Sequence, residues 1–176
     1  MKTKDIKMKI KEYFFLHPTN KLRVRQIERE VKVPLPSVIR YTKELVKEGI
    51  LKKENIANVI IFSSNRSSKQ YLLEKKLFNL RKLFDSGLIN HLIDEYHNPP
   101  IIIFGSYSKG EDLEDSDIDL YIETSSSKKI NLSLFENKLK RDVQPFIHKN
   151  IKRVKNKELI NNIINGITLN GFIEVF

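Results

Sequence analysis

Four residues near the middle of the chain have side chains suited to binding a triphosphate and a metal ion. Gly105 and Ser106 follow a short apolar run, and after ten further residues the chain continues with Asp117 and Asp119. A glycine lets the backbone approach a phosphate, and a serine hydroxyl with neighbouring N–H groups can donate hydrogen bonds to its oxygens. Two aspartates separated by one residue lie on the same side of a strand, about 7 Å apart.

The two carboxylates repel each other unless a cation lies between them. The chain has no Cys, and an oxygen-only ligand set favours Mg²⁺ or Mn²⁺ over Zn²⁺. Mg²⁺ usually completes its coordination with water and substrate phosphates. The pattern therefore predicts a nucleoside triphosphate as substrate, with Asp117 and Asp119 as metal ligands.

Two strands are needed to position these residues. The β-branched run 101–104 predicts a buried strand that ends at Gly105. Residues 117–122 predict a second strand, in which Ile118 and Leu120 face the core while the aspartates face the other way. The competing interpretation is an acidic surface loop that ends in an edge strand.

The stretch 104–122 resembles the signature of the polymerase-β-like nucleotidyltransferase superfamily, most closely that of the minimal nucleotidyltransferases: Gly-Ser, ten residues, Asp-x-Asp. The resemblance covers roughly residues 99–176. It implies that the two aspartates bind the metals and that a second group holds the triphosphate: Gly105, Ser106 and the basic Lys109. To the nucleotide-binding residues we add Ser116.

Members of this superfamily usually carry a third carboxylate on a later, adjacent strand, where it accepts the proton of the attacking hydroxyl. The candidate strand here is 141–147, and we assign the role to Asp142. Gln144 lies on the same face two positions further on and is the alternative occupant. A glutamine cannot act as the base, so the choice between these two residues bears on catalysis.

The first third of the chain carries almost all of the excess charge. Residues 1–66 contain 16 basic and 7 acidic residues, a net charge of +9, whereas residues 67–176 contain 16 and 15. Such an excess points to a polyanionic partner, nucleic acid first. Apolar spacing predicts helices over 5–16 and near 24–31, a third helix from an N-cap at Ser37 to Gly49, and strands over 50–54 and 59–63 joined by residues 55–58.

Three helices followed by a hairpin is the order of a winged helix-turn-helix domain, and residues 36–53 resemble its recognition helix running into the wing. The resemblance covers roughly residues 5–63 and implies DNA binding. We expect base contacts near the start of the third helix and phosphate contacts beyond it, from Ser37, Arg40, Tyr41, Lys43, Lys47, Lys52 and Lys53. The alternative is a solvated basic face on a small helical bundle.

The sequence therefore predicts an α+β protein with three parts. These are a winged helix-turn-helix domain over 1–66, a helical connector over 67–98, and a minimal nucleotidyltransferase domain with a mixed sheet and flanking helices over 99–176. The apolar stripe of the connector packs on the second domain or forms a dimer seam. Zero Cys, and the lack of a signal peptide or of an apolar run of about 20 residues, predict a cytoplasmic protein without a membrane partner.

Two functions fit this organisation. The first is a DNA-binding enzyme that transfers a nucleoside monophosphate from Mg²⁺–NTP to an acceptor hydroxyl. The second is a winged-helix transcriptional regulator whose nucleotidyltransferase domain is inactive and senses nucleotide or binds a partner protein. The resemblance also allows a HEPN-type toxin as the protein partner, because lone minimal nucleotidyltransferases often accompany one.

Overall fold

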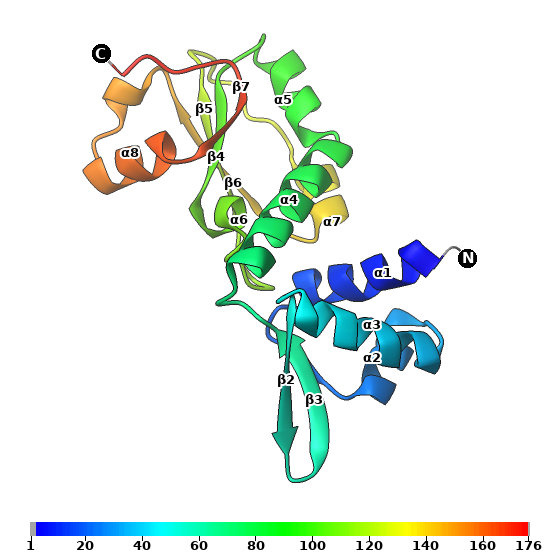
Figure 1. Ribbon diagram of the computed structural model, residues 1–176. Helices are drawn as coiled ribbons and strands as arrows, with labels where there is room; N and C mark the ends of the chain where they lie inside the picture. The colour runs from blue at the N-terminus through cyan, green and yellow to red at the C-terminus, as the bar shows by residue number, and fades with distance from the viewer. Residues whose placement is uncertain (1–2, 176) are drawn as a thin grey trace. The chain divides into compact units, whose positions relative to one another are not determined.

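The computed structural model describes residues 3–175 and divides the chain into two compact units, one ending at Phe78 and the other starting at Asn79 (Figure 1). The boundary falls inside helix α4 (Lys69–Asp85). No helix of the described residues is long and apolar enough to cross a membrane.

The first unit contains three helices and a small antiparallel sheet. Its elements before α4 are α1 (Thr3–Leu16), β1 (Lys21–Leu22), α2 (Val24–Val31), α3 (Leu35–Lys47), β2 (Leu51–Ile56) and β3 (Val59–Ser64). The sheet order is β1-β3-β2, so the hairpin of β2 and β3 is extended by the short β1. The predicted order of three helices followed by a hairpin is confirmed.

Side chains from all three helices form the core of the first unit. Ile10 and Phe14 of α1, Ile27 of α2, and Val38 and Leu45 of α3 are fully buried together. Burial of this apolar surface is the main stabilisation of so small a unit.

Two local predictions for this unit are wrong. Ser37 is not the N-cap of α3, because the helix starts at Leu35 with Pro34 as N-cap and Pro36 in the first turn, where proline is well tolerated. The hairpin loop has two residues instead of four: Ala57 and Asn58 both take positive φ, 46° and 62°. Two such residues give a turn whose twist matches that of the strands, so β2 and β3 pair up to the loop.

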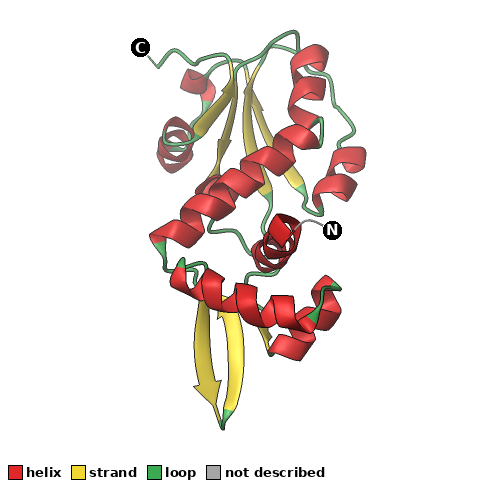
Figure 2. Ribbon diagram, turned by 45° about the vertical axis from the view of Figure 1, so that its right-hand side comes forward, coloured by secondary structure: helices red, strands yellow, loops and turns green. Residues whose placement is uncertain are grey.

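The second unit is built on a four-stranded mixed sheet in the order β6-β5-β4-β7 (Figure 2). Its elements after α4 are α5 (Leu88–Glu95), β4 (Ile101–Phe104), α6 (Gly105–Lys109), β5 (Ile118–Glu123), α7 (Ser133–Leu139), β6 (Val143–His148), α8 (Lys157–Ile164) and β7 (Ile167–Asn170). β5 and β6 are parallel, whereas β4 is antiparallel to both β5 and β7. The mixed sheet with flanking helices that the sequence predicts is confirmed.

Each face of this sheet is covered by its own apolar cluster. Ile103, Ile118 and Leu120 pack with α5, α7 and the second half of α4 on one face. Ile102 and Tyr121 pack with α8 on the other face. Because side chains alternate along a strand, Asp119 lies on the face that carries α8, next to this second cluster.

Gly166 supplies a stability test of the second unit. A Cβ added there would lie 2.6 Å from Ile102 Cγ2, 2.6 Å from the Ile103 carbonyl oxygen and 2.9 Å from the Ile163 carbonyl oxygen. We expect Gly166→Ala to destabilise the unit by about 2 kcal/mol, because two of these contacts are with backbone that cannot move aside alone. Thermal unfolding followed by circular dichroism should show a midpoint lower by roughly 10 °C.

The matched control is Asn162→Ala, an exposed position on α8. It should leave the unfolding midpoint unchanged. Equal stability of Gly166→Ala and the wild type would contradict the close packing of α8 and β7 on β4.

Candidate functional site

The carboxylate of Asp119 lies directly over Gly105. Phe104 pairs with Asp119 in the antiparallel register of β4 and β5, so the end of one strand meets the start of the other. Gly105 has φ +72°, and a Cβ added to it would lie 2.2 Å from Asp119 Oδ2. Only glycine fits here, and the two halves of the Gly-Ser and Asp-x-Asp motif are therefore in contact.

The ionised form of Asp119 is disfavoured in this position. Burial raises the pKa of its carboxyl, and the nearby Asp117 carboxylate raises it further. Asp117 itself is exposed, immediately before β5. A half-buried carboxylate next to a second one is the arrangement that a divalent cation would stabilise.

The parallel pairing of β5 and β6 determines which residues flank the two aspartates. Gln144 pairs with Asp119, and Ile118 N donates a hydrogen bond to the Asp142 carbonyl oxygen at 2.9 Å. Continuing this register places Asp142 beside Asp117. Asp142 and Gln144 are both exposed, so each alternative for the third position lies next to a different member of the aspartate pair.

No group of three or more carboxylate or imidazole side chains among residues 3–175 comes close enough together to form a metal site. Asp117 and Asp119, the cation ligands that the sequence predicts, are thus a pair without a third such side chain grouped with them among these residues. Two carboxylates with oxygen donors only match the ligands that Mg²⁺ takes from proteins, since it keeps water and substrate oxygens in its other positions.

The remaining predicted nucleotide-binding residues lie on the segment between the two strands. Ser106 and Lys109 belong to the single helical turn α6, Ser106 half-buried and Lys109 exposed. Ser116 holds the loop itself: its hydroxyl accepts a hydrogen bond from Leu113 N at 2.9 Å, and its N–H donates to the Leu113 carbonyl oxygen at 3.3 Å.

A buried polar network below this segment was not predicted from the sequence. Asn79 Nδ2 donates to the Tyr107 carbonyl oxygen at 2.9 Å and to Asp112 Oδ1 at 2.7 Å. The Tyr107 hydroxyl donates back to the Asn79 carbonyl oxygen at 3.3 Å. All three residues are at most 3% exposed, and these hydrogen bonds tie α4 to α6 and to the loop that leads to Asp117.

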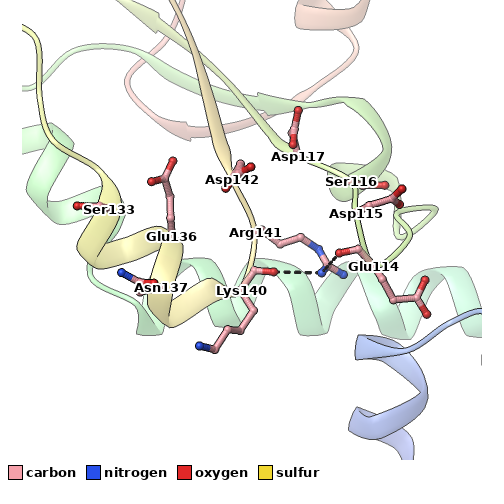
Figure 3. A pocket seen from close by; sticks show the side chains of 10 residues that line it. All are labelled: Glu114, Asp115, Ser116, Asp117, Ser133, Glu136, Asn137, Lys140, Arg141 and Asp142. Atoms are coloured by element: carbon pink, nitrogen blue, oxygen red, sulfur yellow. Dashed lines mark hydrogen bonds between the residues drawn. The ribbon is translucent and has the colours of Figure 1, made fainter.

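Arg141 connects the same loop to the start of β6. Its side chain, 9% exposed, places Nη2 at 3.6 Å from Asp112 Oδ2. Nη1 donates to the carbonyl oxygens of Glu114 and Lys140 (Figure 3). These contacts join the segment that leads to Asp117 with the segment that leads to Asp142, while Arg141 Nε is buried without a hydrogen-bond partner.

A cavity of about 370 Å³ opens beside these two aspartates. Its wall comes from the loop before β5, from α7 and from the segment before β6: Glu114, Asp115, Ser116, Asp117, Ser133, Glu136, Asn137, Lys140, Arg141 and Asp142 (Figure 3). Gly105, Ser106 and Asp119 lie outside this wall. Of the predicted nucleotide-binding residues, Ser116 alone belongs to the cavity wall.

The predicted DNA-binding residues lie in the first unit. Arg40 Nε is 3.0 Å from Glu44 Oε1, and its guanidinium lies 5.2 Å from the centre of the Tyr41 ring. Tyr41 is only 5% exposed and packs in the core, and Ser37 is half-buried. Arg40, Lys43 and Lys47 on α3 are exposed, as are Lys52 and Lys53 on β2.

Gly105→Ala tests the contact with Asp119. The new methyl group would displace the carboxylate, so binding of Mg²⁺–NTP should fall at least about tenfold in isothermal titration calorimetry. Gly87→Ala is the matched control, because Gly87 also has positive φ, +85°, but the nearest atom to an added Cβ is Phe135 Cε1 at 3.9 Å. Equal nucleotide affinity of the two variants would show that the contact has no role in binding.

Asp119→Asn separates stability from cation binding. The folded-state pKa of Asp119 is raised, so this group favours folding most at low pH and disfavours it as pH rises through that pKa. At pH 7 and without metal, the Asn variant should unfold a few degrees above the wild type while losing Mg²⁺ binding. A lower midpoint would contradict the repulsion that we describe.

Cation affinity should also depend on pH. Mg²⁺ binding requires both carboxylates to be ionised. Because the pKa of Asp119 is raised, lowering the pH should weaken Mg²⁺ binding before the pH reaches the ordinary aspartate value of 3.8. Calorimetry between pH 4 and 7 measures the pH at which half of the Mg²⁺ affinity is lost. A midpoint at or below the ordinary value would contradict the burial of this carboxylate.

Comparison with known proteins gives one match, which lies within the second unit. Residues 88–166 match the family model of the nucleotidyltransferase domain. No curated protein and no solved structure matches the chain. The matched segment begins at α5, within the stretch predicted as a connector, and contains Gly105, Ser106, Asp117 and Asp119. The predicted resemblance of the second half to nucleotidyltransferases is supported at this level, because residues 88–166 are similar to the nucleotidyltransferase domain.

Proposed function

We propose that the protein binds Mg²⁺–NTP at Gly105 and Asp119 and transfers the nucleoside monophosphate to an acceptor hydroxyl. The observation that carries this proposal is the Asp119 carboxylate lying on Gly105, 2.2 Å from where a Cβ would be. The contact supports the proposal because a cation held by Asp119 would lie close to a triphosphate held by the backbone around Gly105.

Each residue has a separate role in the proposed reaction. Gly105, Ser106 and Lys109 hold the triphosphate, and Asp117 and Asp119 hold the cation. The bound cation would neutralise the charge that develops on the phosphates. The acceptor oxygen attacks the α-phosphorus, the bond to the bridging oxygen breaks, and pyrophosphate leaves. Asp142, beside Asp117, takes the proton of the acceptor hydroxyl.

Labelled nucleotides test this function directly. The pure protein is incubated with Mg²⁺ and each α-³²P-labelled NTP, with and without cell extract, and a gel then resolves protein and RNA. We expect a labelled band that disappears in Asp117→Ala. Turnover that is unchanged in Asp117→Ala would refute the assignment.

Gln144→Asp tests the third position. Gln144 pairs with Asp119 on the neighbouring strand, and a carboxylate there would add a ligand and a base. We expect the labelling assay to reach half of its maximal rate at about tenfold less Mg²⁺, because the added carboxylate supplies a further ligand for the cation. Gln144→Glu adds the same charge one methylene further away and serves as the control for position. Loss of turnover in both variants would mean that Gln144 itself contacts the substrate.

For the first unit we propose a winged helix-turn-helix that binds DNA through α3 and the hairpin. The net charge of +9 on residues 1–66 and the exposed cations on α3 support this role.

The zero Cys count and the polyanionic ligands favour a cytoplasmic location. If two copies of the chain pair, the second copy binds the second half-site of the DNA.

Lys43→Ala and Lys47→Ala test the DNA contact. Each should weaken binding to duplex DNA for all sequences alike and reduce the slope of log affinity against log salt by about one. Fluorescence anisotropy at several salt concentrations measures both quantities. Lys149→Ala, an exposed position in the second unit, is the control of equal charge. A slope that stays at the wild-type value in both α3 variants would refute this interface.

The second candidate is a regulator whose nucleotidyltransferase domain binds nucleotide or a protein partner without transfer. Gln144 favours it, since an amide stands beside Asp119 where a base would serve catalysis. An empty labelling gel together with measurable nucleotide binding would support this function. A HEPN-type protein recovered from the source cells would identify the partner.

A further inference from the structure

A polar cavity of about 340 Å³ lies in the first unit, away from α3. One side of its wall comes from the sheet of β1, β3 and β2. The other side comes from Pro18 and Thr19 before β1 and from residues 65–67 after β3. Residues 63–67, at the end of β3 and just after it, therefore contribute to a defined hollow.

The register of the sheet places two lysines on either side of one serine. Ser63 pairs with Lys21 on β1 and with Lys52 on β2, so the three side chains lie in a row on one face. Ser63 is 5% exposed, whereas both lysines are exposed at the surface. The two lysines stand on the outer strands β1 and β2 with β3 between them, so an anion above Ser63 would lie between two positive charges.

Arg66 adds a third cation to the same wall. Within the described residues, this wall includes no carboxylate. Lys52 also reaches Glu54, with 2.9 Å between Nζ and Oε1, and this bond lowers the pKa of Glu54 with a smaller contribution from Lys21. Glu54 lies outside the cavity wall, so the wall keeps a net positive charge.

The other polar groups of the cavity are suited to donating hydrogen bonds to oxygens. Hydroxyls of Thr19, Ser63 and Ser67 line it together with the cations, and the Ser67 hydroxyl also donates to Asn65 Oδ1 at 3.3 Å. Three cations and several hydroxyls around one hollow match a compact anion with many oxygens, such as a phosphate group.

We propose that this cavity is a phosphate-binding site, formed by Lys21, Lys52 and Arg66 around Ser63. Ser37, Arg40, Tyr41, Lys43 and Lys47 of α3 lie outside its wall, whereas Lys52 also belongs to the hairpin that we propose binds DNA. The phosphate group comes either from a nucleic-acid backbone or from a free phosphate or mononucleotide. The inference does not rest on nucleotidyl transfer in the second unit.

Phosphate titration of the full-length protein tests this site. Inorganic phosphate, and then a mononucleotide, is added without Mg²⁺ while the backbone amide signals of residues 63–67 are followed by NMR. We expect saturable shifts of these signals. Lys21→Ala and Arg66→Ala should each weaken binding about tenfold, and Arg66→Lys should retain most of it.

Arg29→Ala is the matched control, since Arg29 is an exposed cation of α2 in the same unit. It should titrate like the wild type, and unfolding midpoints check that each variant is folded. If Lys21→Ala and Arg66→Ala also weaken duplex DNA binding more than Arg29→Ala does, the bound phosphate belongs to a nucleic acid. If they weaken only the small ligands, it is a free phosphate. Amide signals that do not shift, or pocket variants that titrate like Arg29→Ala, would overturn the proposal.

Discussion

The close approach of the Asp119 carboxylate to Gly105 is the constraint on which the candidate site depends. It requires antiparallel pairing of β4 with β5 in the register that sets Phe104 opposite Asp119, and a residue without a side chain at position 105. The apolar clusters on the two faces of the sheet hold these strands in that register. A carboxylate that is half-buried next to a second one is costly on its own, which is typical of sites that gain their stability from a ligand.

The strand order explains the chemistry that the rest of the site supports. β6 lies parallel to β5 at an edge of the sheet and brings Gln144 beside Asp119 and Asp142 beside Asp117. The loop before Asp117 has no regular structure of its own, and buried polar contacts from Asn79, Asp112 and Arg141 hold it in place. Replacing Asp112 would take a partner from both Asn79 and Arg141, which is why we regard this network as part of the site.

Much of the local structure could be predicted from the sequence. The β-branched run before Gly105, the alternation around Asp119 and the helical spacing of the first third all follow short-range patterns, and the structure agrees with them. Contacts between distant segments were out of reach: no local pattern relates Asn79 to Asp112 and Arg141, or Lys21 to Ser63 and Lys52. The start of α3 was also predicted wrongly. Ser37 is a residue type that suits an N-cap, but Pro36 is tolerated in the first turn and the helix begins earlier. Which of the two aspartates lies beside Asp142 and which beside Gln144 depends on the register of the parallel strands β5 and β6, and local sequence patterns do not give that register.

Calorimetric titration of a non-hydrolysable NTP analogue in the presence and absence of Mg²⁺ tests the central claim most directly. The claim predicts saturable binding that requires Mg²⁺ and that is lost when Asp117 and Asp119 are both replaced by Ala. Binding that is equally tight without Mg²⁺, or that survives in the double variant, would contradict a cation-assisted nucleotide site at the contact between Asp119 and Gly105.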